Sequence, residues 1–205
     1  MFQSLYVKLY QHLDHTPSNV ANSKRMFAYI IDWYVGSLCM SIPVVFIFSY
    51  LSGTTEITQS LFNFPGNSGY VAGALALLFG ILYYVIIPLT VWKGQTLGKR
   101  MMGFKIVKDD MHDVDIMTML KREVIFIFLL EGSMYSASSY IHQIISMLVG
   151  YDLVHIFMYI GIVITVASGS LVLKFDARKM FHDYFAKTRV INVVKDTEGK
   201  GVGAL

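Results

Sequence analysis

The stretch "YVAGALALLFGILYYVIIPLTVW", residues Tyr70–Trp92, decides the fold of this chain. It contains no Asp, Glu, Lys or Arg. About 20 apolar residues in helical form cross the roughly 30 Å hydrocarbon core of a bilayer. The composition agrees, because 55% of the 205 residues are hydrophobic and only 15% are charged, whereas a soluble domain keeps about a quarter of its residues charged. The sequence therefore predicts an integral membrane protein.

Three further stretches are long enough to span, and two of them carry polar side chains. The first contains Asp32 and the third contains Glu131 and His142, whereas the last has no charged residue. A charge near the bilayer centre costs at least about 2.5 kcal/mol on insertion scales, so these side chains need partners or water inside the bundle. We predict an all-α membrane protein, a four-transmembrane-helix bundle with short cytoplasmic strand and amphipathic elements. Its expected spans are 26–51, 70–92, 124–149 and 153–173.

The positions of the cations predict the orientation. All 17 Lys and Arg residues lie before the first span, between the second and third, or after the fourth, and the linkers 52–69 and 150–152 have none. By the positive-inside rule both termini and the central loop are cytoplasmic. A three-span chain would leave one cationic group outside, so the pattern also favours a span at 124–149. We expect a multi-pass plasma-membrane protein whose first span is an uncleaved anchor, since polar sequence precedes it.

The segments outside the spans divide the chain further. Residues 1–22 form a cytoplasmic segment in which apolar residues recur at helical spacing, as in a short interfacial helix, although a frayed terminus fits the pattern too. Residues 23–194 make up the membrane domain, and 195–205 a flexible tail. The central loop contains a strand-like run at Phe104–Val107 and an amphipathic approach to the third span, and a second strand-like run closes the domain.

Asp32 and Glu131 are the candidate ion-binding residues. At 1.5 Å per residue, Asp32 lies about 9 Å and Glu131 about 10 Å from the cytoplasmic ends of their spans, so the two carboxylates share a depth. Helical spacing places Tyr135 and His142 on the face of Glu131. Two interpretations follow: a proton or cation site formed by Asp32 and Glu131, or a structural polar network that keeps four helices in register.

Arg25 lies on the helix face of Asp32, but about 10.5 Å of helical rise separates them. Asp32 leans toward the inner surface while Arg25 extends away from it, which disfavours a direct salt bridge. We expect Arg25 to contact lipid phosphate or Asp183. For Asp32 the expected partners are Lys99, Arg100 or a tyrosine hydroxyl.

Other motifs give no support for catalysis or for a metal site. Cys39 is the single cysteine, so no disulfide framework or cysteine metal site is available. "GQTLGKR" lacks the spacing and the Ser or Thr of a phosphate loop, and "DDMHDVD" lacks the glycine and final glutamate of a calcium loop. His182–Asp183 has no accompanying nucleophile. We therefore expect no enzyme activity, no metal, no cofactor and, at a net charge of +3, no nucleic-acid partner.

Three motifs together resemble the RDD family of small integral membrane proteins, named for one arginine and two aspartates. "KRMFAYIIDWYV" places the family arginine on Arg25 and the first aspartate on Asp32, and "FHDYFAKTRVI" places the second on Asp183, beside His182. Lys187 departs from the glycine that is common in the family at its position. "GQTLGKRMMGFKIVKDD" is similar to the glycine-rich segment after the second helix, and its candidate residues are Gly94, Thr96, Gly98, Lys99, Arg100 and Gly103.

The resemblance implies two alternative functions. Family membership suggests transport of a small solute or ion, with some members linked to sodium/proton exchange. Asp32 and Glu131 would then bind protons or monovalent cations in alternation, while Arg25 and Asp183 brace the cytoplasmic mouth. Four spans is a small scaffold without an obvious broken helix pair, so a transporter of this size would form a homo-oligomer. The alternative is a non-catalytic accessory or regulatory partner of another membrane protein complex, which binds through the cytoplasmic surface and its methionine-rich runs.

Overall fold

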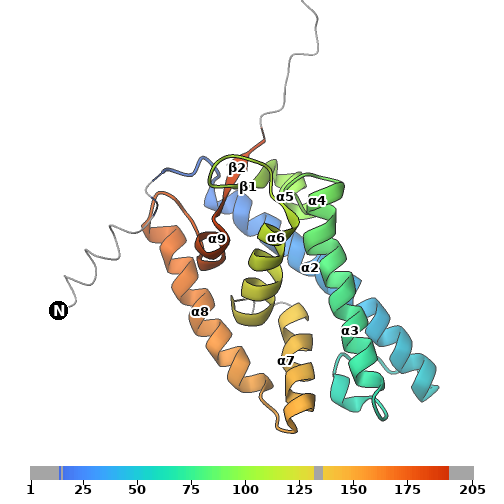
Figure 1. Ribbon diagram of the computed structural model, residues 1–205. Coiled ribbons are helices and arrows are strands. Elements are labelled where there is room, and N and C mark those ends of the chain that lie inside the picture. The colour runs from blue at the N-terminus through green and yellow to red at the C-terminus, as the bar shows by residue number, and fades with distance from the viewer. Residues whose placement is uncertain (1–13, 15, 132–135, 194–205) are drawn as a thin grey trace, which may run out of the picture.

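The apolar stretches form long helices, and the short elements α5, α9, β1 and β2 gather at one end of the molecule (Figure 1). The computed structural model describes residues 14, 16–131 and 136–193. Three helical stretches are long and apolar enough to cross a membrane, or four if a bent pair counts as one span. The three are α2 (Asn22–Ser52), the continuous run of α3 (Ser68–Ile81), η2 (Leu82–Ile86) and α4 (Ile87–Thr90), and α8 (Val154–Lys174).

The expected third span is not one continuous helix. The segment α6 (Ile116–Met119) continues into the π-helix η3 (Leu120–Glu131), and α7 (Ser136–Val149) follows at an angle of 67°. The prediction of an unbroken helix over 124–149 therefore needs correction.

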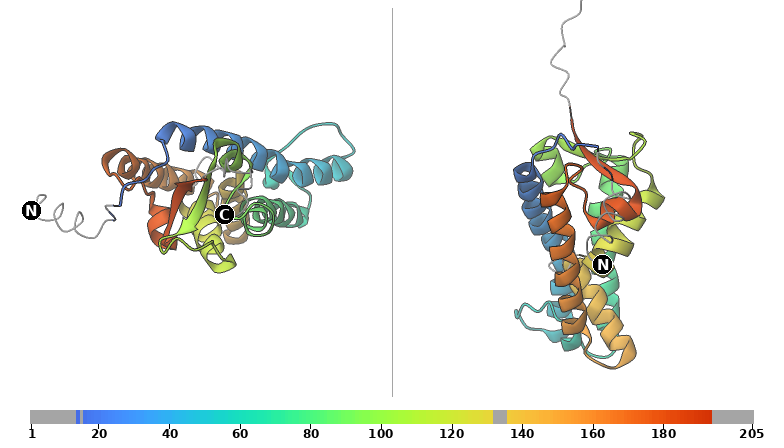
Figure 2. Two further views of the ribbon diagram at one scale, coloured as in Figure 1. Left: turned by 90° about the horizontal axis from the view of Figure 1, so that it is seen from above. Right: turned by 90° about the vertical axis from the view of Figure 1, so that its left-hand side faces the viewer.

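Short elements form a layer across one end of the long helices. It contains α5 (Leu97–Met102) and α9 (Phe181–Ala186), together with the two-stranded antiparallel sheet of β1 (Phe104–Lys108) and β2 (Thr188–Asn192). Phe104 pairs with Asn192 and Lys108 pairs with Thr188, so the two strand-like runs of the sequence are partners. The view from above in Figure 2 shows this sheet lying over the helix ends.

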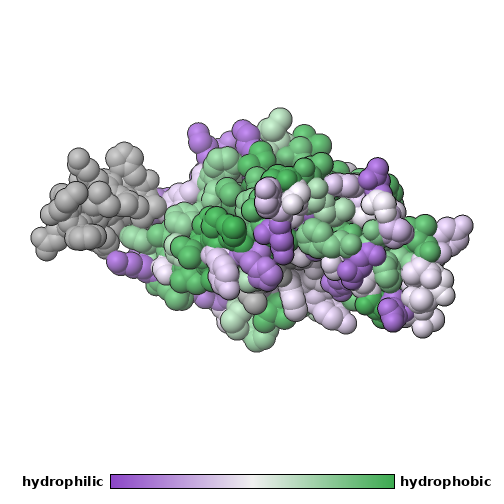
Figure 3. Space-filling view, turned by 90° about the horizontal axis from the view of Figure 1, so that it is seen from below, coloured by the Kyte–Doolittle hydropathy of each residue, from purple (hydrophilic) through white to green (hydrophobic). Residues whose placement is uncertain are grey.

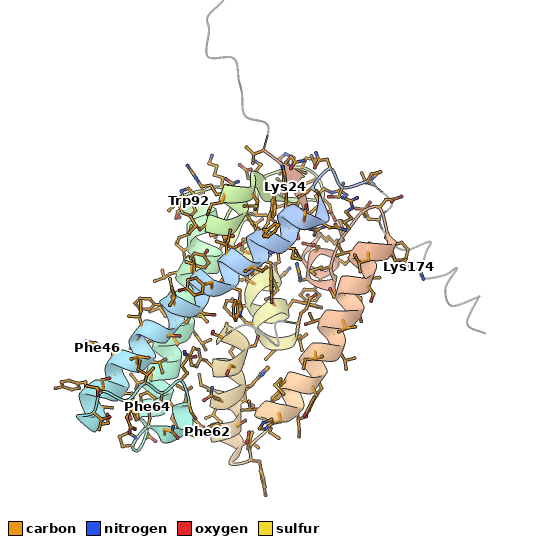
Figure 4. The ribbon with its side chains drawn as sticks, turned by 180° about the vertical axis from the view of Figure 1, so that it is seen from behind. Lys24, Phe46, Phe62, Phe64, Trp92 and Lys174 are labelled. Atoms are coloured by element: carbon orange, nitrogen blue, oxygen red, sulfur yellow. The ribbon has the colours of Figure 1, made fainter. Side chains whose placement is uncertain are left out.

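The two ends of the molecule differ in composition, as the charge pattern predicts. Lys24, Trp92 and Lys174 lie at the end that carries the sheet (Figure 4). The opposite end holds the linker with the short helix η1 (Leu61–Asn63). Figure 3 looks onto that opposite end, where hydrophobic surface surrounds scattered hydrophilic residues.

The helices α2 and α3 pack closely because small residues face large ones. A Cβ atom on Gly36 would lie 2.2 Å from the Tyr84 hydroxyl oxygen, and one on Gly80 would lie 2.5 Å from the Met40 sulfur. Small residues at helix contacts let backbones approach in lipid, where no hydrophobic force drives helices together. This contact brings η2, with its two tyrosines, against the middle of α2.

Two sequence predictions fall outside the described residues. The interfacial helix would occupy residues 1–13, and the flexible tail 195–205 lies beyond residue 193.

Candidate functional site

Asp32 is surrounded by hydrogen-bond donors. Its side chain is 1% exposed. Oδ1 accepts from the Tyr83 hydroxyl at 2.8 Å and from the Gly98 N–H at 2.7 Å. Oδ2 accepts from the Thr96 hydroxyl at 2.5 Å and from the Lys99 ammonium at 3.1 Å. A carboxylate has about four lone-pair sites, so these donors saturate it.

This arrangement makes Asp32 an external cap for helix α5. The first backbone N–H groups of a helix lack partners within the helix, and the positive end of its dipole favours an anion. The Thr96 side chain does not cap its own helix, and the carboxylate of Asp32 takes the Gly98 N–H instead. A Cβ atom on Gly98 would lie 2.3 Å from the Ala28 carbonyl oxygen, so glycine is required for this close approach.

The other residues of the glycine-rich segment hold it against the sheet. Gly94 has φ of 77°, and a Cβ atom there would lie 2.2 Å from the Ile106 carbonyl oxygen. Gly103 ends α5 with φ of 73°. Arg100 does not reach Asp32 as one alternative suggested, because its guanidinium lies over the Trp92 ring, 5.1 Å from the ring centre.

Asp183 accepts from donors that come from distant parts of the chain. It is fully buried and lies 3.5 Å from Arg25 and 3.1 Å from Arg122. The Thr188 hydroxyl and the Met180 N–H each donate to it at 3.2 Å. The expected pairing of Arg25 with Asp183 is therefore present, and no bond joins Arg25 to Asp32 among the described residues.

Positive charge stabilises the ionised form of Asp183. Burial opposes ionisation, but the charges of His182, Arg122 and Arg25 outweigh burial and hold the pKa of this carboxyl below its usual range. Asp183 is thus the buried anion that joins α9 to the first and third spans.

Arg122 is the functional residue that the sequence reasoning missed. Its side chain is 5% exposed and contacts Asp183, Glu123 and, at 2.9 Å, the Nε2 atom of His182. Arg122 and Glu131 are nine residues apart, which in an α-helix of 3.6 residues per turn puts them on opposite faces. In a π-helix, with i→i+5 bonds and about 4.4 residues per turn, the same separation is about two turns and one shared face. The one available signal was a cation–anion pair, Arg122–Glu123, directly before an apolar run.

Glu131 and His182 form a buried carboxylate–imidazole pair. The Oε2 atom of Glu131 lies 2.6 Å from Nδ1 of His182, and the side chains are 6% and 8% exposed. The Oε1 atom is buried and has no hydrogen-bond partner among the described residues. The buried Ser168 hydroxyl lies near the Glu131 carboxylate, but the two are farther apart than an ordinary hydrogen bond. The pair therefore retains one free acceptor position.

Two described polar side chains of α7 bond backbone carbonyls of η3, which is the behaviour of the structural polar network given as one of the two interpretations. Ser138 donates to the Ile127 carbonyl, and His142 bonds the Leu129 carbonyl at 3.3 Å. From α8, Thr165 donates to the Glu131 carbonyl. These carbonyls belong to the end of η3, where the helix stops and its last acceptors need partners. His142 thus helps to satisfy the end of the broken span, and Tyr135 lies outside the described residues.

The structure separates the two carboxylates that the sequence grouped. Within the described part of the chain, no hydrogen bond or ion pair joins Asp32 to Glu131, and their hydrogen-bond and ion-pair partners differ. It instead groups Glu131 with His182, Arg122 and Asp183, where η3 meets α9.

The fold and site define a class: a multi-pass membrane protein with a buried charge network beneath a small layer of short elements. Residues 21–187 match the RDD family, and the chain belongs to that family. A relative from Bacillus subtilis (strain 168), named "Uncharacterized protein YckC", is 27% identical over 101 residues. That match covers 49% of this chain and 54% of the relative. No solved structure matches the chain.

Proposed function

We propose that this protein transports a proton or a monovalent cation and that the Glu131–His182 pair is its intramembrane loading site. The observation that carries the proposal is the bare Oε1 oxygen of Glu131, which is buried beside an imidazole at the break in a spanning segment. Ionisable groups inside a membrane bundle are expensive and mark ion pathways or proton relays.

The broken third span supports the proposal. Discontinuous spanning helices are a recurring feature of secondary transporters, and their inner ends form ion sites together with carboxylates. The sequence offered no obvious broken helix, whereas the structure has an angle of 67° between Ile116–Glu131 and Ser136–Val149. Glu131 is the last residue before that break.

The chemistry of the pair suits a proton better than a metal cation. A carboxylate and an imidazole 2.6 Å apart can share one proton and accept a second on the bare carboxylate oxygen. Arg122 contacts the same imidazole and disfavours an additional fixed positive charge nearby. The cycle would therefore alternate between the unprotonated and the protonated pair.

Flux measurements on purified protein in liposomes test the proposal. A pH gradient or a sodium gradient should drive proton movement, reported by a trapped pH dye, and Glu131→Gln should abolish it. Glu56→Gln is the matched control, because it makes the same chemical change at an exposed residue of the linker between the first two spans. If Glu131→Gln protein that elutes as a folded species keeps wild-type flux, Glu131 is not the loading site.

An accessory role is the second candidate, favoured by exposed apolar side chains on α5, on α6 and on the turn between β1 and α6. Met101, Met111, Ile116 and Met117 are each more than half exposed. Methionine surfaces adapt to partner proteins. Under this alternative, the wild-type protein shows no flux and co-purifies with another membrane protein in a fixed ratio. The double variant Met101→Ser with Met117→Ser no longer co-purifies with that protein.

A further inference from the structure

A hollow of about 380 Å³ opens on the layer of short elements, away from the Glu131 pair. It lies between the start of η3 and the end of α9, which Figure 1 shows side by side. Its lining includes three lysines, a threonine hydroxyl and an aromatic ring: Lys108, Lys121, Lys187, Thr118 and Phe185.

The acidic residues of the hollow are already paired. Asp109 contacts Lys179 at 2.5 Å and Arg189 at 3.4 Å. Asp110 accepts from the His112 N–H at 3.0 Å. Each carboxylate therefore has a bonding partner other than the lysines of the hollow.

Two of the three lysines have no such partner. Lys108 contacts Asp115 at 2.6 Å. Lys121 and Lys187 are exposed, and within the described residues neither forms an ion pair. Asp110 is exposed and its hydrogen bond comes from a neutral backbone N–H, so its charge also faces the hollow. With three lysines against two carboxylates the lining still has an excess of positive charge, and its ammonium groups and the Thr118 hydroxyl are a set of donors for a phosphate group.

Lys187 occupies a backbone position that suits glycine. It ends α9 with φ of 53°, in the left-handed region that side chains with a Cβ atom rarely adopt. Its side chain lines the hollow. A strained non-glycine residue at the edge of a charged hollow points to a use for the side chain rather than to stability.

The hollow also borders the apolar surface of a spanning segment. Phe185 is 51% exposed, and its ring centre lies 5.3 Å from that of Phe126 in η3. Ile125, next to Phe126, is 46% exposed. A ligand with a phosphate among the lysines would therefore have hydrocarbon-facing rings directly beside it, as a phospholipid requires.

We propose that this hollow binds the phosphate group of an anionic phospholipid. Lys121, Lys187 and Thr118 contact the phosphate, and the acyl chains lie along Phe185 and Phe126. Basic residues at the inner membrane surface attract anionic lipid. No residue of the Glu131 network lines the hollow, so the lipid site is distinct from the proposed loading site.

Lipid retention on the full-length protein tests this site. Protein reconstituted in nanodiscs with mixed phosphatidylglycerol and phosphatidylcholine is extracted, and bound lipid is counted by native mass spectrometry. Lys121→Gln with Lys187→Gln should weaken retention of phosphatidylglycerol by roughly tenfold or more. The control is Lys24→Gln with Lys93→Gln, which removes the same charge from exposed residues near the same end and should leave retention unchanged.

Two further outcomes decide the source and the specificity. Inorganic phosphate or glycerol phosphate at millimolar concentration should not displace the lipid, and displacement would identify a site for a soluble anion instead. Equal losses in the two double variants would show diffuse surface attraction and overturn the proposal. Lys187→Gly separates binding from folding, since it should raise the melting temperature and lower retention together; unchanged retention in this variant also contradicts the site.

Discussion

Asp32 and Glu131 are both buried carboxylates in spanning segments, and they differ in how completely they are bonded. Asp32 accepts four hydrogen bonds from two separate segments, η2 and the start of α5. Glu131 has one imidazole partner and one bare oxygen. A saturated carboxylate has no acceptor position left for an ion, whereas a half-bonded one does. The comparison assigns assembly of the fold to Asp32 and, in our proposal, ion binding to Glu131.

The three residues that resemble the family signature, Arg25, Asp32 and Asp183, all form contacts that assemble the fold. Arg25 and Asp183 join the first span to α9, and Asp32 joins it to α5. Each contact connects segments far apart in the chain, so the signature describes how the layer of short elements attaches to the spans. The residues proposed for ion binding lie next to these contacts but are not among the three signature residues.

The largest effect is expected at Asp183. Asp183→Asn leaves Arg122 and Arg25 without their shared anion, and loss of one partner from a buried ion pair costs about 3–5 kcal/mol. The variant should unfold in detergent at a much lower temperature than wild type. Size-exclusion chromatography after heating measures this unfolding. A melting temperature near that of wild type would show that the two arginines are satisfied elsewhere.

The stabilising effect of Asp183 should be independent of pH near neutrality. Its folded-state pKa lies below the usual range, so its contribution is complete above the unfolded pKa of about 3.9 and is lost as the pH falls through the folded value. The difference in melting temperature between wild type and Asp183→Asn should be constant from pH 8 to pH 5 and shrink only in stronger acid. A difference that shrinks already near pH 6 would contradict the depressed pKa.

Asp32→Asn should have the next largest effect on stability. The amide keeps one acceptor oxygen but removes the charge that pairs with Lys99, and hydrogen bonds to charged groups are worth about 1.5–3 kcal/mol. Protection of the α5 amides in hydrogen exchange should fall, since the Gly98 N–H loses part of its cap. Unchanged protection would mean that Asp32 does not hold α5.

Gly98→Ala tests the same contact sterically. The added Cβ atom would meet the Ala28 carbonyl at 2.3 Å, and overpacking of this kind costs about 1–3 kcal/mol. Gly169→Ala is the matched control, because a Cβ atom there has no neighbour within 4 Å among the described residues. Equal thermal stability of the two variants would show that α5 can move away from α2 without cost.

The sequence predicted the elements better than the network inside them. Length and hydropathy were enough for the spans around α2, α3 and α8. The lean of side chains along a helix was enough to exclude an Arg25–Asp32 salt bridge, and Asp183 was one of the two partners expected for Arg25. The position of Arg122 could not be predicted, because the α-helical period places it opposite Glu131 and only π-winding brings the two together. The break after Glu131 was hidden for a related reason, since hydropathy continues across it while the direction of the chain changes.

The central claim is tested most directly by comparing proton flux per folded molecule in liposomes for wild type, Asp32→Asn and Glu131→Gln. Glu131→Gln removes the carboxylate of the buried pair with His182, so it should be less stable than wild type, and its folded fraction should lose its flux. Asp32→Asn should also be less stable, yet its folded fraction should conduct protons at close to the wild-type rate. The opposite result, with flux lost in folded Asp32→Asn protein and kept in Glu131→Gln, would contradict the division of roles between the two carboxylates.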